Sequence, residues 1–293
     1  MREFKYYKVD AFTSGNSLGN PAAFIDTGSL ELSSEEMLKI GKEHKGFVSE
    51  IVFCNKSYKA DMKLTYYSSE CEVSFCGHGT IATMYELIIN NKELMEKKEI
   101  IIETNKKGLL KVYNKILNDN AVFITAPKPV WNKIEVSIKD IALALKINEN
   151  EISIKYPLDF IDAGLSTLIV PIEKYEKEIL INPDQEELKL FCIKNQIDII
   201  LVYTKEASKK EYIAHTRVFA PKFGYLEDPA TGSGNSAFGY YMLKNKIWSG
   251  ETASIEQGRE NIVFNEIKLT TNNGEVLFGG KATKRIEGMY YLE

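Results

Sequence analysis

Two short glycine-rich segments constrain the fold of this chain more than any other feature: FCGHGT at 75–80 and TGSGNS at 231–236. Each stands directly before an apolar pattern with helical spacing. After the first segment the apolar positions are Ile81, Met84, Tyr85, Ile88 and Ile89, and after the second they are Phe238, Tyr241 and Met242. Several strand patterns precede each segment. The sequence therefore predicts an α+β architecture that occurs twice, with a buried helix in each half.

Local patterns predict the elements around these helices. Ser33 and Glu36 form a capping-box pair ahead of a short helix. Alternating stretches such as FKYYKVDAF predict strands, EIIIETNKKGLLKVYN predicts a hairpin that turns near Lys107 and Gly108, and NNG marks the turn of a second hairpin near the C-terminus.

The glycine-rich turns predict an anion site. A helix N-terminus presents unpaired N–H groups and the positive end of the helix dipole, and glycines let a carboxylate or phosphate approach the backbone. TGSGNSAFG has no lysine after its glycines, so it is not a Walker-type loop, and Gly232, Gly234 and Gly239 lack the spacing of a dinucleotide fingerprint. We expect a small carboxylate-bearing ligand and no nucleotide.

Four polar residues near the turns are of the types that proton transfer needs: Glu50, His78, Asp228 and Ser233. Each also has a purely structural interpretation. His78, Asp228 and Ser233 are ordinary capping or packing residues for a helix start, and Glu50 is equally consistent with an exposed strand position. A free cysteine usually packs as a small buried hydrophobic residue, and this is the structural interpretation of Cys76 in the first turn.

Composition excludes several classes of partner. The net charge is −4 and the lysines are scattered, which argues against a nucleic-acid surface. No apolar stretch is long enough for a membrane helix and the N-terminus is charged, so we expect a cytoplasmic protein. Four cysteines do not make a disulfide scaffold. The spacing of Cys71, Cys76 and His78 matches no standard zinc pattern, so no metal site is predicted.

Taken together, four ordered segments resemble the PhzF family of phenazine-biosynthesis-like isomerases, which share the diaminopimelate epimerase fold. They are VDAFTSGNSLGNPAAF at 9–24, FVSEIVF at 47–53, FCGHGT at 75–80 and EDPATGSGNSAFG at 227–239. The resemblance implies two similar domains, each a mixed sheet around a central helix. We expect one domain at 1–118, completed by 283–293, a second at 119–282, and an active site in the cleft between them.

The resemblance also implies roles for individual residues. Glu50 is the principal acid/base, with His78, Asp228 and Ser233 as the other catalytic positions. Substrate-binding backbone is expected at Gly77, Gly79, Gly232 and Gly234. The implied chemistry is a cofactor-independent isomerisation that moves a proton on a small anionic metabolite, without metal, pyridoxal phosphate or nucleotide. Relatives are commonly homodimers, although this sequence carries no clear interface signature.

Two departures limit these expectations. The related epimerases use one cysteine in each turn, whereas here Thr231 stands opposite Cys76, which argues against a two-thiol racemase. The segment QGRENIVF at 257–264 departs from the family pattern, which weakens inference about substrate contacts there. Two alternatives stay open: a metabolite-binding or adaptor protein that keeps the fold without catalysis, and an amino-acid racemase or epimerase that uses Cys76 with another group.

Overall fold

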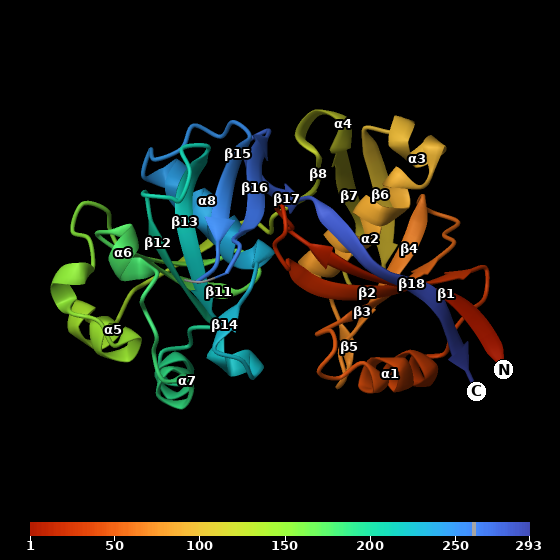
Figure 1. Cartoon of the computed structure of the whole chain (residues 1–293), viewed down its shortest axis with the longest axis horizontal. Coiled ribbons are helices and arrows are strands. Elements are labelled where there is room, and N and C mark those ends of the chain that lie inside the picture. The colour runs from red at the N-terminus through yellow and green to blue at the C-terminus, as the bar shows by residue number, and fades with distance from the viewer. Residues whose placement is uncertain (260–261) are drawn as a thin grey trace. The chain divides into compact units, whose positions relative to one another are not determined.

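A computed structural model describes residues 1–259 and 262–293. The chain forms two compact units. The first comprises residues 1–13, 18–124 and 279–293, and the second comprises residues 14–17 and 125–278. Each unit contains its own strands and one long helix that begins at a glycine-rich turn (Figure 1).

The first unit is built from nine strands and four helices among the described residues. The strands are β1 (Arg2–Ala11), β2 (Asn20–Gly28), β3 (Ile51–Asn55), β4 (Met62–Tyr67), β5 (Glu72–Val73), β6 (Glu99–Thr104), β7 (Gly108–Lys115), β8 (Ala121–Thr125) and β18 (Ala282–Leu292). The helices are α1 (Ser34–Glu43), α2 (Gly77–Ile89), α3 (Lys92–Glu96) and α4 (Ile116–Asp119).

The second unit has the remaining elements. Its strands are β9 (Val130–Asn132), β10 (Asp159–Asp162), β11 (Ser166–Pro171), β12 (Ile199–Thr204), β13 (Tyr212–Phe219), β14 (Glu227–Asp228), β15 (Ala253–Gln257), β16 (Asn265–Asn272) and β17 (Glu275–Gly280). Its α-helices are α5 (Ile138–Leu145), α6 (Tyr175–Glu178), α7 (Gln185–Lys194) and α8 (Gly232–Lys244), with 3₁₀ turns η1 (Glu149–Glu151) and η2 (Pro221–Phe223).

The strand pairings repeat in the same order in both units. In the first unit, β2 and β3 are parallel, β3 and β4 antiparallel, β4 and β6 parallel, and β6 and β7 antiparallel. In the second, β11 and β12 are parallel, β12 and β13 antiparallel, β13 and β15 parallel, and β15 and β16 antiparallel. The glycine-rich helix falls at the same step of both series. The predicted α+β fold with repeated architecture is therefore confirmed.

The two long helices are central in their units. Helix α2 contacts β1, β2, β3 and β18, and helix α8 contacts β10, β11, β12 and β16. Most residues of both helices are buried, as their apolar patterns predict. The helical pattern also predicts that Ile89 is buried, and this prediction is wrong, because Ile89 is 44% exposed. It is the last residue of α2, where the helix ends at Asn90.

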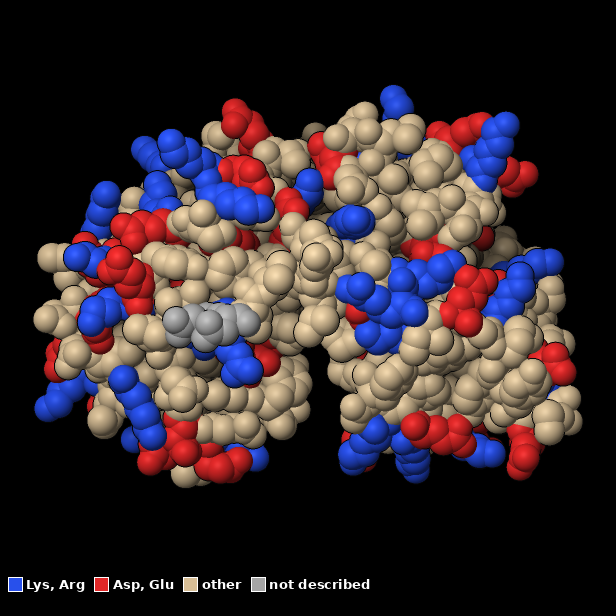
Figure 2. Space-filling view, in the orientation of Figure 1, with Lys and Arg blue, Asp and Glu red and all other residues tan. Residues whose placement is uncertain are grey.

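Local signals set other elements as predicted. Ser33 and Glu36 form the expected capping box at α1. In the turn between β16 and β17, Asn273 and Gly274 both have positive φ, as a two-residue hairpin turn of type I′ requires. Lys/Arg and Asp/Glu side chains are interspersed on the face shown in Figure 2. No helix in the described part of the chain is long and apolar enough to cross a membrane.

Candidate active site

The first glycine-rich turn is held by its own polar groups. Cys76 caps helix α2, and its Sγ accepts a hydrogen bond from the Gly79 amide at 3.3 Å. The Thr80 hydroxyl donates to the Cys76 carbonyl at 2.7 Å, and the buried Tyr66 hydroxyl lies 2.8 Å from the Thr80 oxygen. Because the Thr80 proton is committed, Tyr66 donates to it. These bonds fix the cap conformation without using the amides of Gly77 and His78.

Close packing brings this turn against strand β3. A Cβ atom on Gly79 would lie 2.9 Å from Val52 Cγ2 and 3.0 Å from Cys76 Sγ, so only glycine fits without displacement. Glu50 precedes Val52 by two residues, and side chains two apart in an extended chain share a side. The packing of Val52 on α2 therefore directs Glu50 to the same helix start.

Glu50, Cys76 and His78 form one cluster at that helix start. His78 Nε2 lies 3.4 Å from Glu50 Oε2, and Cys76 Sγ lies 3.8 Å from the same oxygen. The sulfur is 3.5 Å from His78 Nδ1. The Glu50 and His78 side chains keep 22% and 16% of their surface exposed, so part of each side chain is open to solvent. The sequence indicates Glu50 and His78 separately, and the structure brings them together.

The imidazole is held in its neutral form near neutral pH. Burial lowers the pKa of His78 below its ordinary value, and the nearby Glu50 carboxylate opposes this shift only in part. A neutral imidazole has one nitrogen that accepts a proton and one that donates. With a carboxylate beside it, the cluster contains the pair of groups that a proton shuttle needs.

The second glycine-rich turn is organised by Gln257, a residue that sequence reasoning missed. Its Oε1 accepts from the Thr231 amide at 3.1 Å and from Asn235 Nδ2 at 2.8 Å. Its Nε2 donates to the Asp228 carbonyl at 2.9 Å and to the Thr231 hydroxyl at 3.2 Å. Gln257 is fully buried. Complete burial of this side-chain amide at the end of β15 would have indicated its role, but a single sequence does not show which residues are buried.

The predicted residues of the second turn lie around the start of α8. Asp228 is half-buried on β14, and its Oδ1 accepts from the Ala230 amide at 3.1 Å. Ser233 is half-buried in the first turn of α8. A Cβ on Gly232 would lie 2.3 Å from Phe278 Cε2, whereas one on Gly234 would meet Ile199 Cδ1 at 3.2 Å. Gly232 therefore allows the helix start to pack on the Phe278 ring.

The two turns differ at their equivalent cap residues. Cys76 and Thr231 are the N-caps of α2 and α8. The Cys76 sulfur faces its own helix and the imidazole, whereas the Thr231 hydroxyl receives a hydrogen bond from Gln257 and makes no cap bond to α8. Since a hydroxyl is also a far weaker acid than a thiol, Thr231 does not take the place of a second cysteine base.

A buried ion pair supports the strand that carries Asp228. Arg217 on β13 contacts Glu227 through two bonds, Nε to Oε1 at 3.0 Å and Nη2 to Oε2 at 2.8 Å. Its Nη1 donates to the carbonyls of Glu178, Ile179 and Ile181. The bidentate guanidinium contact fixes Glu227 and thereby the neighbouring Asp228. The sequence did not indicate that Arg217 pairs with Glu227, because an arginine within a strand pattern is ordinary.

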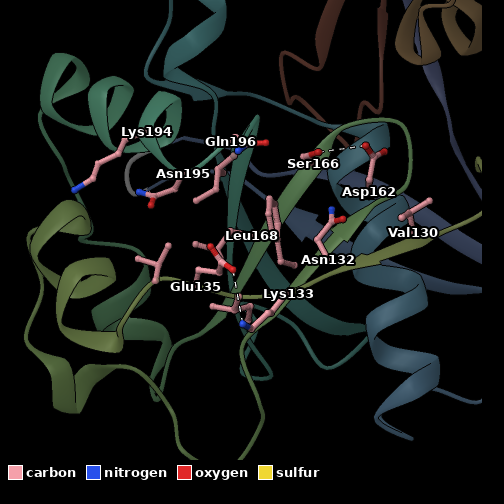
Figure 3. Close-up of a pocket in the computed structure, with 14 residues that line it drawn as sticks. Val130, Asn132, Lys133, Glu135, Asp162, Ser166, Leu168, Lys194, Asn195 and Gln196 are labelled. Atoms are coloured by element: carbon pink, nitrogen blue, oxygen red, sulfur yellow. Dashed lines mark hydrogen bonds and ion pairs between the residues drawn. The ribbon is translucent and has the colours of Figure 1, made fainter.

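A separate hollow of about 470 Å³ lies in the second unit (Figure 3). Its lining includes Asn132, Lys133, Glu135, Asp162 and Lys194. None of the residues predicted for the site lines it, and its charged side chains include both signs. It contains no cysteine or histidine beside a carboxylate, so it offers no acid/base cluster of the kind that surrounds Glu50.

The family model for phenazine biosynthesis-like proteins, PhzC-PhzF, matches residues 9–288, and the chain belongs to this family. "Uncharacterized isomerase YfhB" of Bacillus subtilis is 30% identical over 264 residues, covering 89% of this chain and 88% of that protein.

Solved structures agree in fold. The PhzF-family phenazine biosynthesis protein of Bacillus anthracis is 24% identical, with a TM-score of 0.87 over 100% of both chains. A hydroxyproline epimerase from Agrobacterium vitis has a TM-score of 0.60 at 11% identity, covering 99% of this chain and 91% of that one. The predicted diaminopimelate epimerase-like fold is thus confirmed.

The segment 257–264 departs from the family pattern, and its residues 260–261 lie outside the described residues.

Proposed function

We propose that this protein is a cofactor-independent isomerase that moves a proton on a small carboxylate-bearing metabolite by general acid/base catalysis. Family membership and relatives named as isomerases support an isomerase or epimerase function. The observation that carries the finer proposal is the 3.4 Å separation of Glu50 Oε2 and His78 Nε2 at the start of α2. Once the carboxylate has taken a proton from the substrate, a neutral imidazole at that distance can accept it in turn.

Glu50 removes the proton from an activated carbon and returns it, or an equivalent proton, at another position. His78 relays or positions that proton. The amides at the start of α2 lie beside this pair, and unpaired N–H groups at a helix start stabilise a carboxylate and developing negative charge. The roles of Asp228, Ser233, Gly232 and Gly234 in orienting substrate stay predictions from the family resemblance. So do the cytoplasmic location and the homodimer.

Exchange with heavy water tests the proposal across many candidate substrates at once. The protein is incubated in D₂O with a panel of hydroxylated and aminated small carboxylates, and loss of C–H signals is followed by proton NMR. The wild type is expected to exchange one position of at least one compound. Glu50→Gln is expected to slow this by about 10²–10⁴-fold, the usual contribution of a general base.

Glu70→Gln is the matched control, because Glu70 is an exposed glutamate paired with Lys45 at 3.0 Å. It should exchange at the wild-type rate. A folded Glu50→Gln protein that exchanges as fast as wild type would refute the assignment of the base. Binding of a panel compound without any exchange in the wild type would favour the non-catalytic binding alternative.

A racemase or epimerase that uses Cys76 is the second candidate. The contact that favours it is the Cys76 sulfur lying within 3.8 Å of Glu50 Oε2. Cys76→Ser discriminates between the two: loss of exchange similar to that of Glu50→Gln would favour the thiol mechanism, and near-normal exchange would exclude it.

A further inference from the structure

The cluster of Glu50, Cys76 and His78 offers a metal three different ligand types at once. A carboxylate oxygen, a thiol sulfur and an imidazole nitrogen lie within 4.8 Å of one another. Their sequence spacing matches no standard zinc pattern because Glu50 is 26 residues before Cys76. Strand β3 and helix α2 bring them together, so only the fold reveals the set.

The separations of the three ligand atoms are close to those of a tetrahedral zinc shell, whereas the orientation of the imidazole ring is not. Zinc bonds are about 2.3 Å long to sulfur and about 2.0–2.2 Å long to nitrogen and oxygen. In a tetrahedral shell the sulfur therefore lies about 3.6 Å from a nitrogen or oxygen ligand, and a nitrogen lies about 3.4 Å from an oxygen. Here Sγ lies 3.8 Å from both Oε2 and Nε2, and Nε2 lies 3.4 Å from Oε2. The sulfur also lies 3.5 Å from Nδ1, so it faces the ring itself, and the imidazole must rotate before its Nε2 lone pair points to an ion shared with Oε2 and Sγ.

The ligand chemistry favours zinc over harder cations. Sulfur and imidazole nitrogen are poor ligands for Mg²⁺ and Ca²⁺, which require oxygen. The N–H···S bond from Gly79 holds the Cys76 sulfur at the start of α2, on the side of Glu50 and His78. The partial exposure of Glu50 and His78 provides an entry path and leaves a fourth position for water.

We infer that Glu50, Cys76 and His78 bind one Zn²⁺ ion in a three-ligand site, and that this ion blocks the acid/base pair rather than serving it. Binding occupies the lone pairs of Glu50 and His78 that proton transfer needs, so zinc and catalysis are mutually exclusive. The inhibitory consequence rests on the proposed isomerase function, whereas the binding site does not. Zinc here is an inhibitor, and the prediction of metal-independent turnover is unaffected.

Direct binding is measured with the full-length, reduced protein after treatment with EDTA and removal of the chelator. Zn²⁺ is titrated in competition with a chromophoric chelator. We expect one site per chain, weakened at least tenfold in Cys76→Ser, His78→Asn and Glu50→Gln. Mg²⁺ and Ca²⁺ at millimolar concentration should not displace the ion. Cys71→Ser is the matched control, because Cys71 is an exposed free thiol outside the cluster.

The outcomes separate the two proposals. Equal zinc affinity in Cys76→Ser and wild type, or the absence of a one-to-one site, overturns the metal inference whatever the activity. Circular dichroism of each variant confirms that weakened binding is not unfolding. Zinc binding that depends on the cluster, together with undiminished exchange in Glu50→Gln, would sustain the metal site and refute the proposed base. Reversal of zinc inhibition by EDTA supports both.

Discussion

Replacing Gln257 by alanine tests the interpretation that this side chain builds the second glycine-rich turn. The substitution removes the acceptor of the Thr231 amide and one of two acceptors of Asn235 Nδ2, which keeps the Thr231 carbonyl at 2.9 Å. It also removes the donor to the Asp228 carbonyl. The start of α8 then loses its link to strand β15.

The cost follows from burial. A buried amide left without a partner costs about 1–3 kcal/mol. The void left by the missing side-chain atoms adds about 1–2 kcal/mol, because a fully buried site relaxes only in part. The expected loss in free energy of unfolding is therefore about 2–5 kcal/mol. At about 2–4 °C per kcal/mol for a domain of this size, Tm falls by roughly 4–20 °C.

Urea denaturation followed by circular dichroism measures the loss. Gln185→Ala at the start of α7 is the control, since Gln185 is only half-buried, and should change stability by less than about 0.5 kcal/mol. A double-mutant cycle with Asn235→Ala should show coupling, because the two amides are bonded directly at 2.8 Å. Gln257→Ala with wild-type stability, or purely additive effects in the cycle, would refute this account of the turn.

Two further predictions concern the other groups of the site. Gly232→Ala should destabilise by about 1–3 kcal/mol through overpacking, because the new Cβ would lie 2.3 Å from Phe278 Cε2; a thermal melt at least as high as wild type would contradict that packing. Below pH 6.5, the ordinary His pKa, stability should fall as pH falls, because the lowered pKa of folded His78 means that the unfolded chain binds more protons. His78→Asn should flatten that part of the pH–stability curve measured by urea denaturation, and an unchanged slope would exclude His78 as its source.

Most local structure was predictable because it depends on near neighbours in sequence. The two glycine-rich segments begin α2 at Gly77 and α8 at Gly232, as their helical spacing indicated. The Asn273–Gly274 turn follows from the residues that tolerate positive φ. Ile89 was misplaced because a periodic pattern does not specify where a helix stops.

The site was predictable only in part. Glu50 and His78 were identified by residue type and by resemblance to the family, but their 3.4 Å contact depends on how Val52 packs against Gly79. Gln257 and Arg217 were missed because a polar residue in a strand pattern is normally read as solvent-exposed. Their importance comes from complete or nearly complete burial, which a single sequence does not reveal.

The two helix starts, their glycine and cap residues, and the kind of chemistry that such turns support all follow from the amino-acid sequence. The contacts of Cys76 with Glu50 and His78, and the hydrogen bond from Gln257 to the Thr231 hydroxyl, exist only in the folded chain. The physical reason is one of range. Caps and turns form between residues a few positions apart, whereas the cluster depends on strand β3 lying against helix α2, and that packing is set by the whole first unit.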